Sequence, residues 1–123
     1  MTDEREPRRI QRQRTAGWRM PEGVKYVGRP TRWANPISIS GNEKDSYSLY
    51  YGGSLMGAGL TRAQAHTAAV RHYLALVKPE RMDLSELRGL DLACWCPLED
   101  ADGTPLACHA DALLELANKA DPR

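Results

Sequence analysis

The residues best suited to chemistry are three cysteines and a histidine gathered in the last third of the chain: Cys94, Cys96, Cys108 and His109. Three thiolates and one imidazole are a common donor set of structural zinc sites. A strand through Cys94 and Cys96 places both thiols on one side, with their β-carbons roughly 6.5–7 Å apart. A helix beginning near Cys108 lowers the pKa of that thiol, which favours the metal-binding thiolate. We therefore predict a metal site, with zinc as the expected ion, held by these four residues.

Other interpretations of this cluster stay open. Adjacent ligands at Cys108 and His109 can converge only if Cys108 lies just before the first helical turn, and Asp111, His66 or His72 could take the place of His109. The cysteines could also be small buried hydrophobes, which is a common role of free cysteine. In a catalytic interpretation, Cys108 or a metal-bound water is the reactive group and Asp111 the acid or base.

A second chemical signal is the concentration of arginine near the N-terminus. Nine of the 17 Lys and Arg residues lie among the first 33 residues, and all but Lys25 of these are arginine. Arginine pairs with phosphate, and cations interleaved with aromatic residues suit a nucleotide or a nucleic acid. The residues expected to bind phosphate or nucleotide are Arg9, Arg12, Arg14, Trp18, Arg29, Arg32, Trp33 and Asn35. The alternatives are a solvated arm with tryptophans in the core, or contact with a protein.

The elements that position these residues can be read from local patterns. Residues 24–28 and 90–96 are β-type runs, and the second one alternates apolar and polar side chains. Thr61 and Gln64 form a capping-box pattern that begins a helix over 61–78, with an apolar stripe at spacings of three and four. A short helix over 84–88 follows Asp83, and a last helix runs from about 108 to 118.

This order of elements predicts an α/β fold, with a short, mostly parallel sheet, two main helices and one short helix. Residues 1–7 are expected to be a disordered arm and residues 8–123 a single domain. Residues 38–59, rich in Ser, Gly and Tyr without clear periodicity, are predicted to be a long loop. Short additional strands within 8–20 or 36–52 remain possible on this pattern.

Composition narrows the class of protein. The 123 residues are 41% hydrophobic and 27% charged, which is ordinary for a globular protein. The longest apolar runs fall short of the roughly 18–20 residues that span a bilayer, so no membrane partner is expected. An odd number of cysteines (three) and a charged N-terminus without an apolar stretch favour a reducing compartment, so we expect a cytoplasmic protein.

Four stretches together resemble the domain-of-unknown-function family numbered 4326, found in bacteriophages and bacteria. They are residues 9–18, 26–36, 87–97 and 108–118. The chain departs from the family at Ala34, where glycine is usual, and in a longer loop between Cys96 and Cys108. The resemblance brings no established activity. It implies that the family's motifs share Arg29, Trp33, Asn35, Cys94, Cys96, Cys108, His109 and Asp111, and a phage origin would place the protein in the host cytoplasm.

These observations lead to one main hypothesis and two alternatives. The main one is a small metal-binding domain, with zinc as the metal, that recognises a nucleotide or nucleic acid through an Arg/Trp surface. The first alternative is an enzyme acting on nucleotides or modified bases, and the second is an interaction protein such as a phage-encoded inhibitor. Four protein ligands favour a structural metal, whereas three ligands and a water favour catalysis.

Overall fold

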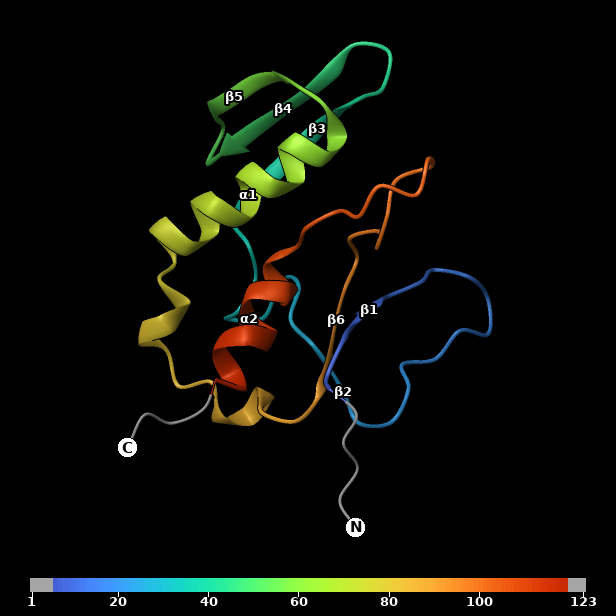
Figure 1. Cartoon of the computed structure of the whole chain (residues 1–123), viewed down its shortest axis with the longest axis vertical. Coiled ribbons are helices and arrows are strands. Elements are labelled where there is room, and N and C mark those ends of the chain that lie inside the picture. The colour runs from blue at the N-terminus through green and yellow to red at the C-terminus, as the bar shows by residue number, and fades with distance from the viewer. Residues whose placement is uncertain (1–5, 120–123) are drawn as a thin grey trace.

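The computed structural model describes residues 6–119, which form two three-stranded sheets and two α-helices (Figure 1). In chain order the elements are β1 (Arg9–Gln11), β2 (Val24–Tyr26), β3 (Ile37–Asn42), β4 (Ser46–Tyr51), β5 (Ser54–Leu60), α1 (Arg62–Leu76), the 3-10 turns η1 (Pro79–Arg81) and η2 (Ser85–Leu87), β6 (Asp91–Cys94) and α2 (His109–Ala117). None of the helices within 6–119 is long and apolar enough to cross a membrane.

The first sheet is parallel and has the order β1-β6-β2. The two strands recognised in the sequence, β2 and β6, are parallel, as predicted, and they are neighbours in the sheet. All four residues of β6 are buried, as expected for a central parallel strand covered on both faces. The core beside this sheet brings together residues such as Leu92 and Leu113, because α2 packs against β6 and β1.

The second sheet, β3-β4-β5, is antiparallel and occupies the segment that we expected to be a loop. The expectation for 38–59 was wrong, and the protein is not mostly parallel. Gly52 and Gly53 both have positive φ and join β4 to β5 as a two-residue hairpin, a conformation that glycine permits without steric cost. Few residues of these strands are buried, Ile37 and Leu49 among them, so the period-two signal is weak.

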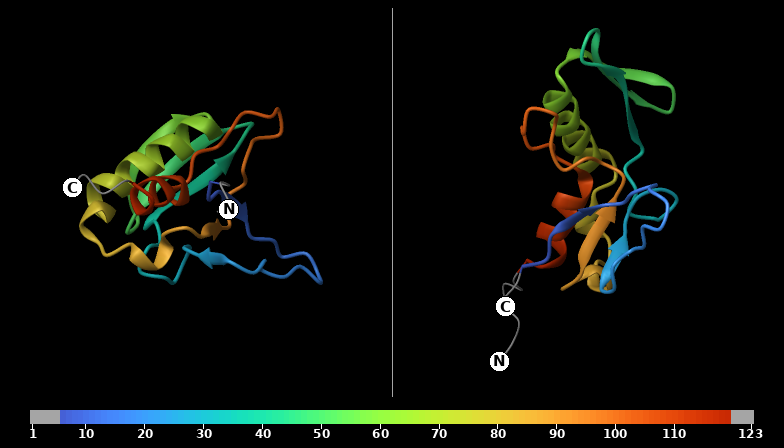
Figure 2. Two further views of the ribbon diagram at one scale, coloured as in Figure 1. Left: turned by 60° about the horizontal axis from the view of Figure 1, so that its bottom comes forward. Right: turned by 90° about the vertical axis from the view of Figure 1, so that its right-hand side faces the viewer.

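Helix α1 begins with the predicted capping box between Thr61 and Gln64 and ends at Leu76 rather than at Lys78. Its buried face serves two cores. Ala65 and Ala69 pack under the antiparallel sheet, whereas Tyr73 belongs to the core beside the parallel sheet. Figure 2 shows the two sheets at opposite ends of an elongated molecule, with α1 beside the antiparallel sheet and α2 beside the parallel one.

The remaining predictions concern the short helix, the last helix and the N-terminal arm. The short helix over 84–88 is a 3-10 turn over Ser85–Leu87, preceded by a side-chain bond in which Ser85 N–H donates to Asp83 Oδ1 at 3.0 Å. The last helix begins at His109, as expected. Of the arm predicted over 1–7, residues 1–5 lie outside the described residues, and residues 6 and 7 are irregular.

The buried hydroxyl of Tyr73 tests how α1 is held to the parallel-sheet half. It donates a hydrogen bond of 2.7 Å to the backbone carbonyl of Trp33. Tyr73→Phe leaves that carbonyl unpaired inside the core, which should lower the free energy of unfolding by about 1–3 kcal/mol. Urea denaturation measures this loss. Tyr51→Phe, at an exposed position, should change stability little, and equal stability of both variants would contradict the assigned role.

Candidate metal centre and ligand cavity

Three cysteine sulfurs converge at the end of β6 and the start of α2. Cys94 is the last residue of β6, Cys96 lies two residues beyond it, and Cys108 precedes the first residue of α2. Their Sγ atoms all lie within 4.8 Å of one another, and those of Cys94 and Cys108 are 3.0 Å apart. Sulfurs that share a tetrahedral zinc at 2.3 Å are about 3.8 Å apart, between these two values. The cluster can therefore hold a metal ion once the sulfur–sulfur distances change by about 1 Å.

The backbone of Cys108 meets the condition that adjacent ligands require. Its φ of −148° and ψ of 153° are extended, so it stands just outside the helix that His109 begins. His109 Nδ1 lies 3.5 Å from Cys108 Sγ, and Nε2 lies 2.9 Å from the carbonyl of Val27. Because a carbonyl only accepts, Nε2 carries the proton and Nδ1 has its lone pair toward Cys108. His109 thus adjoins the three-cysteine cluster through a nitrogen able to bind a metal.

The pKa values of the three thiols are shifted in different directions. Hydrogen bonds from Cys108 and Cys96 hold the pKa of Cys94 far below its usual value. Hydrogen bonds to Cys94 and Cys96, together with burial, raise the pKa of Cys108. Of the three thiols, Cys94 is therefore the one for which these contacts most favour the thiolate form. A divalent cation entering the cluster would displace the remaining thiol protons, since the thiolate is the form that binds metal.

Arg9 supplies the positive charge beside these sulfurs. Its side chain is only 7% exposed, and it donates to the backbone carbonyls of Pro97 and Leu106 and forms an ion pair of 3.3 Å with Asp111. Burial lowers the pKa of Arg9, but its acidic neighbours, Asp111 first and then Cys108 and Cys94, raise it by more. The guanidinium therefore stays charged and joins β1, the 97–107 loop and α2 around the cluster.

Both carboxylate oxygens of Asp111 have structural partners. Oδ1 pairs with Arg9 Nε, and Oδ2 accepts a hydrogen bond of 3.0 Å from the backbone N–H of Cys108. The carboxylate thus caps α2 and fixes the position of Arg9. Asp111 also lies outside the cavity described next, and no described Asp or Glu lines that cavity.

A cavity of about 250 Å³ opens directly onto the cysteine cluster. One wall comes from β3 and α1, including Ile37, Ile39 and Val70, and the other from residues at the carboxyl ends of β2 and β6. Two buried histidines, His66 and His109, line it together with the three cysteines. The cavity therefore lies where the two halves of the molecule meet, with sulfur and imidazole groups in its wall.

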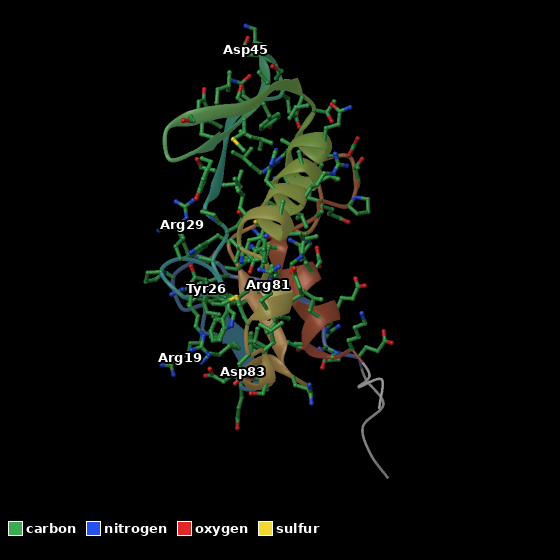
Figure 3. The ribbon with its side chains drawn as sticks, turned by 90° about the vertical axis from the view of Figure 1, so that its left-hand side faces the viewer. Arg19, Tyr26, Arg29, Asp45, Arg81 and Asp83 are labelled. Carbon is green, nitrogen blue, oxygen red and sulfur yellow. The ribbon has the colours of Figure 1, made fainter. Side chains whose placement is uncertain are left out.

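The cavity rim carries aromatic rings and arginines. Tyr26, Arg29 and Trp95 all line the cavity. The guanidinium of Arg12 lies 4.5 Å from the ring centre of Tyr26 and 4.9 Å from that of Trp95, and Arg14 lies 4.4 Å from Trp95. Figure 3 shows Tyr26 and Arg29 on the same side of the molecule, below the antiparallel sheet. We call Arg12, Arg14, Arg29, Tyr26 and Trp95 the basic-aromatic rim.

The remaining residues predicted to bind nucleotide lie away from the rim or have intramolecular partners. Trp33 is buried in the core, and Arg32 covers its ring and forms an ion pair with Glu86. Asn35 donates from Nδ2 to the carbonyl of Ala69, and its Oδ1 accepts from the N–H of Ile37. Trp18 is half-buried in the 12–23 connection, where its backbone N–H donates to the backbone carbonyl of Thr15.

Sequence reasoning named His66 only as an alternative metal ligand, and it did not name Tyr26 or Trp95 as ligand-binding residues. His66 donates through Nδ1 to the carbonyl of Ala107 at 3.1 Å, and burial lowers its pKa, so it is neutral and its Nε2 is an acceptor. Trp95 did carry a local signal, because an aromatic residue between two candidate metal ligands lies next to any site they form. His66 carried none beyond its place on the buried face of α1.

The sequence was compared with known proteins. The model of a family described as "Domain of unknown function (DUF4326)" matches residues 10–119. The match covers β6, the cysteine cluster and both α-helices. Neither a curated protein nor a solved structure matched the chain.

The role of Arg9 can be tested by Arg9→Lys, which keeps the charge but loses the planar fork of donors. At least one carbonyl of the 97–107 loop then loses its buried partner, so we expect a loss of at least about 1–3 kcal/mol in unfolding free energy. Amide hydrogen exchange should also become faster at residues 98–106. Arg8→Lys, an exposed neighbour, is the control, and exchange unchanged by Arg9→Lys would show that Arg9 does not hold the loop.

Proposed function

The chain belongs to the DUF4326 family, and we propose that it is a zinc-binding domain that recognises a nucleotide or nucleic acid. The observation that carries the proposal is the convergence of three cysteine Sγ atoms within 4.8 Å in the wall of a cavity with a basic-aromatic rim. Thiolate sulfur is a preferred ligand of zinc, and it does not suit magnesium or calcium, which take oxygen ligands.

In this proposal His109 is the fourth zinc ligand. Its Nδ1 lone pair is already next to Cys108, and its Nε2–H is held by the Val27 carbonyl, the kind of outer bond that orients metal-binding histidines. A zinc with four protein ligands would join β6 to α2. It would thereby stabilise the fold where the chain offers only a small core.

The nucleotide part of the proposal rests on the basic-aromatic rim. Arg12 and Arg14 lie against the ring of Trp95, which is 36% exposed, so the aromatic surface and the charges are presented together. Guanidinium groups pair with phosphate oxygens, and bases stack on exposed aromatic rings. Among the arginines near the N-terminus, Arg9 has a buried structural role, so Arg12, Arg14 and Arg29 are the ones we assign to phosphate.

One observation favours a second candidate, an enzyme acting on nucleotides or modified bases. The cavity reaches all three cysteines, so a zinc held by them alone would have its fourth position toward a bound ligand. Such a zinc activates a water molecule, as in catalytic sites with three protein ligands. Cys108 as a nucleophile is the other form of this candidate, with the His109 Nδ1 lone pair as its base.

Zinc content decides the metal part of the proposal. The purified chain should contain one zinc per molecule by elemental analysis, and Cys96→Ser should lose most of it, because a serine hydroxyl is a poor zinc ligand. Full zinc occupancy in Cys96→Ser would falsify the proposed ligand set.

His109→Gln separates the two candidates. Glutamine places an amide near the position of Nε2, which keeps a donor for the Val27 carbonyl but removes Nδ1. If His109 is the fourth ligand in the native chain, His109→Gln should lower zinc affinity by about tenfold or more, at least as much as the loss of an outer-shell partner. His72→Gln on α1 is the control. Unchanged zinc affinity in His109→Gln would instead support a three-cysteine zinc with an open position.

Salt dependence tests the phosphate contacts. A fluorescently labelled AMP and a labelled short single-stranded oligonucleotide should each be tried, and binding of at least one should weaken as salt rises. Arg12→Gln, Arg14→Gln and Arg29→Gln should each lower affinity and flatten the salt dependence by about one phosphate contact. Arg81→Gln, an exposed cation on η1, is the control. Affinity that does not change with salt would exclude phosphate contact by the rim.

A further inference from the structure

We propose that the cavity takes the base of a single nucleotide, with its phosphate on the arginines of the basic-aromatic rim and His66 Nε2 accepting a hydrogen bond from the base. This inference rests on the proposed nucleotide recognition and specifies its ligand. It favours a mononucleotide over a nucleic-acid strand, and it gives His66 a role that its sequence context did not suggest.

The size of the cavity favours one ring system. Its volume of about 250 Å³ is just below the range of roughly 300–1,000 Å³ that is typical of sites for drug-sized ligands. Proteins that bind single strands use instead a long basic groove on which successive bases stack. The space between β3, α1 and the ends of β2 and β6 is large enough for one base but not for its neighbours in a strand.

The walls of the cavity favour a flat ring. Tyr26 and Trp95 offer aromatic surfaces from the parallel-sheet side, whereas Ile37, Ile39 and Val70 are aliphatic groups on the opposite side. A planar heteroaromatic ring can stack on the aromatic side chains and bury its other face against aliphatic carbon. A flexible apolar chain would not use the arginines that stand at the same opening.

His66 supplies a hydrogen-bond acceptor inside the cavity. The bound ring should therefore carry N–H groups. The Nδ1–H of His66 is bonded to the Ala107 carbonyl, which leaves the Nε2 lone pair as an acceptor, and the described residues contain no partner for that atom. His66 lines the cavity and its side chain is otherwise largely buried, so this acceptor is available to a ligand inside the cavity. Base rings with amino or imino hydrogens satisfy it. Asn35, the polar residue that we expected to read a base, already uses both ends of its amide.

The rim places positive charge where a phosphate attached to that base would emerge. Arg29 lines the cavity, and its Nη2 donates at 3.3 Å to the carbonyl of Asn35, which directs the side chain along the cavity opening. Arg12 lies over Tyr26 and Trp95, two residues of the same opening. A cavity with aliphatic and aromatic walls, the His66 acceptor inside and guanidinium groups at its opening matches a nucleoside monophosphate from base to phosphate.

The experiment is calorimetric titration of the full, zinc-loaded chain with AMP, CMP, GMP and UMP. At least one of these nucleotides should bind. The matching nucleoside lacks the phosphate contacts and inorganic phosphate lacks the base contacts, so each should bind at least tenfold more weakly than the nucleotide. A single-stranded oligonucleotide of the same base should not bind more tightly than the mononucleotide. Zinc content is measured on each sample.

His66→Asn tests the acceptor. The asparagine amide can replace Nδ1 as donor to the Ala107 carbonyl but has no atom at the position of Nε2. His66→Asn should lower the affinity for the mononucleotide by about tenfold, which is the effect of one hydrogen bond, while zinc content stays the same. His72→Asn, on the same helix and outside the cavity, should change neither quantity.

A second pair of variants tests the cavity without relying on His66. Ile39→Trp on β3 fills the space and should abolish mononucleotide binding, whereas Ser38→Trp points to the other face of the strand and should leave it intact. Binding that survives Ile39→Trp, or equal affinity in His66→Asn and the native chain, overturns the inference.

The outcomes also separate this inference from the proposed function. If the zinc-loaded chain binds the oligonucleotide but none of the four mononucleotides, the inference fails and nucleic-acid recognition stands. If neither kind of ligand binds to zinc-loaded protein, nucleotide recognition fails and the inference fails with it. If the mononucleotide binds to a chain that holds no zinc, the inference stands and the metal assignment fails.

Discussion

The parallel direction of β1, β6 and β2 brings the candidate site together. Parallel strands have their carboxyl ends at one edge of the sheet, and ligand sites in such sheets form beyond that edge. Here the edge brings together Arg12 after β1, Tyr26 at the end of β2, and Cys94 at the end of β6. Cations, an aromatic ring and a thiolate from three distant parts of the sequence meet there because the strands run the same way.

A buried arginine completes this edge. The guanidinium of Arg9 joins the loop after β6 to Asp111 in the first turn of α2, and it lies beside the thiolate of Cys94. Burying a charge is costly unless it is paired and hydrogen-bonded, and Arg9 meets both conditions. The same contacts keep Cys108 near Cys94, so the cation organises the cysteine cluster even though it would not itself bind a metal.

Helix α1 explains why a cavity remains at the junction of the two halves. Its first turns pack on the antiparallel sheet through Ala65 and Ala69, and Tyr73, near its other end, enters the core beside the parallel sheet. Between these contacts the helix passes over the cysteine cluster, with His66 and Val70 facing the space below. The side chains at the first contact are small and the one at the second is large, and the two cores that they enter are separate.

Several local elements and the three-cysteine cluster could be predicted from the sequence. The capping box, the two strands of the parallel pair and the start of α2 depend on hydrogen bonds and periodicity within a few residues, and the cysteine pattern predicted the cluster through them. The antiparallel sheet was missed because so few of its side chains are buried. The different surroundings of the N-terminal arginines depend on the tertiary fold. Arg9 and Arg12 look alike in the sequence, but Arg9 donates to carbonyls some 90 residues away, whereas Arg12 lies over the half-buried ring of Tyr26 and the exposed ring of Trp95. Burial by residues so far along the chain has no local signature.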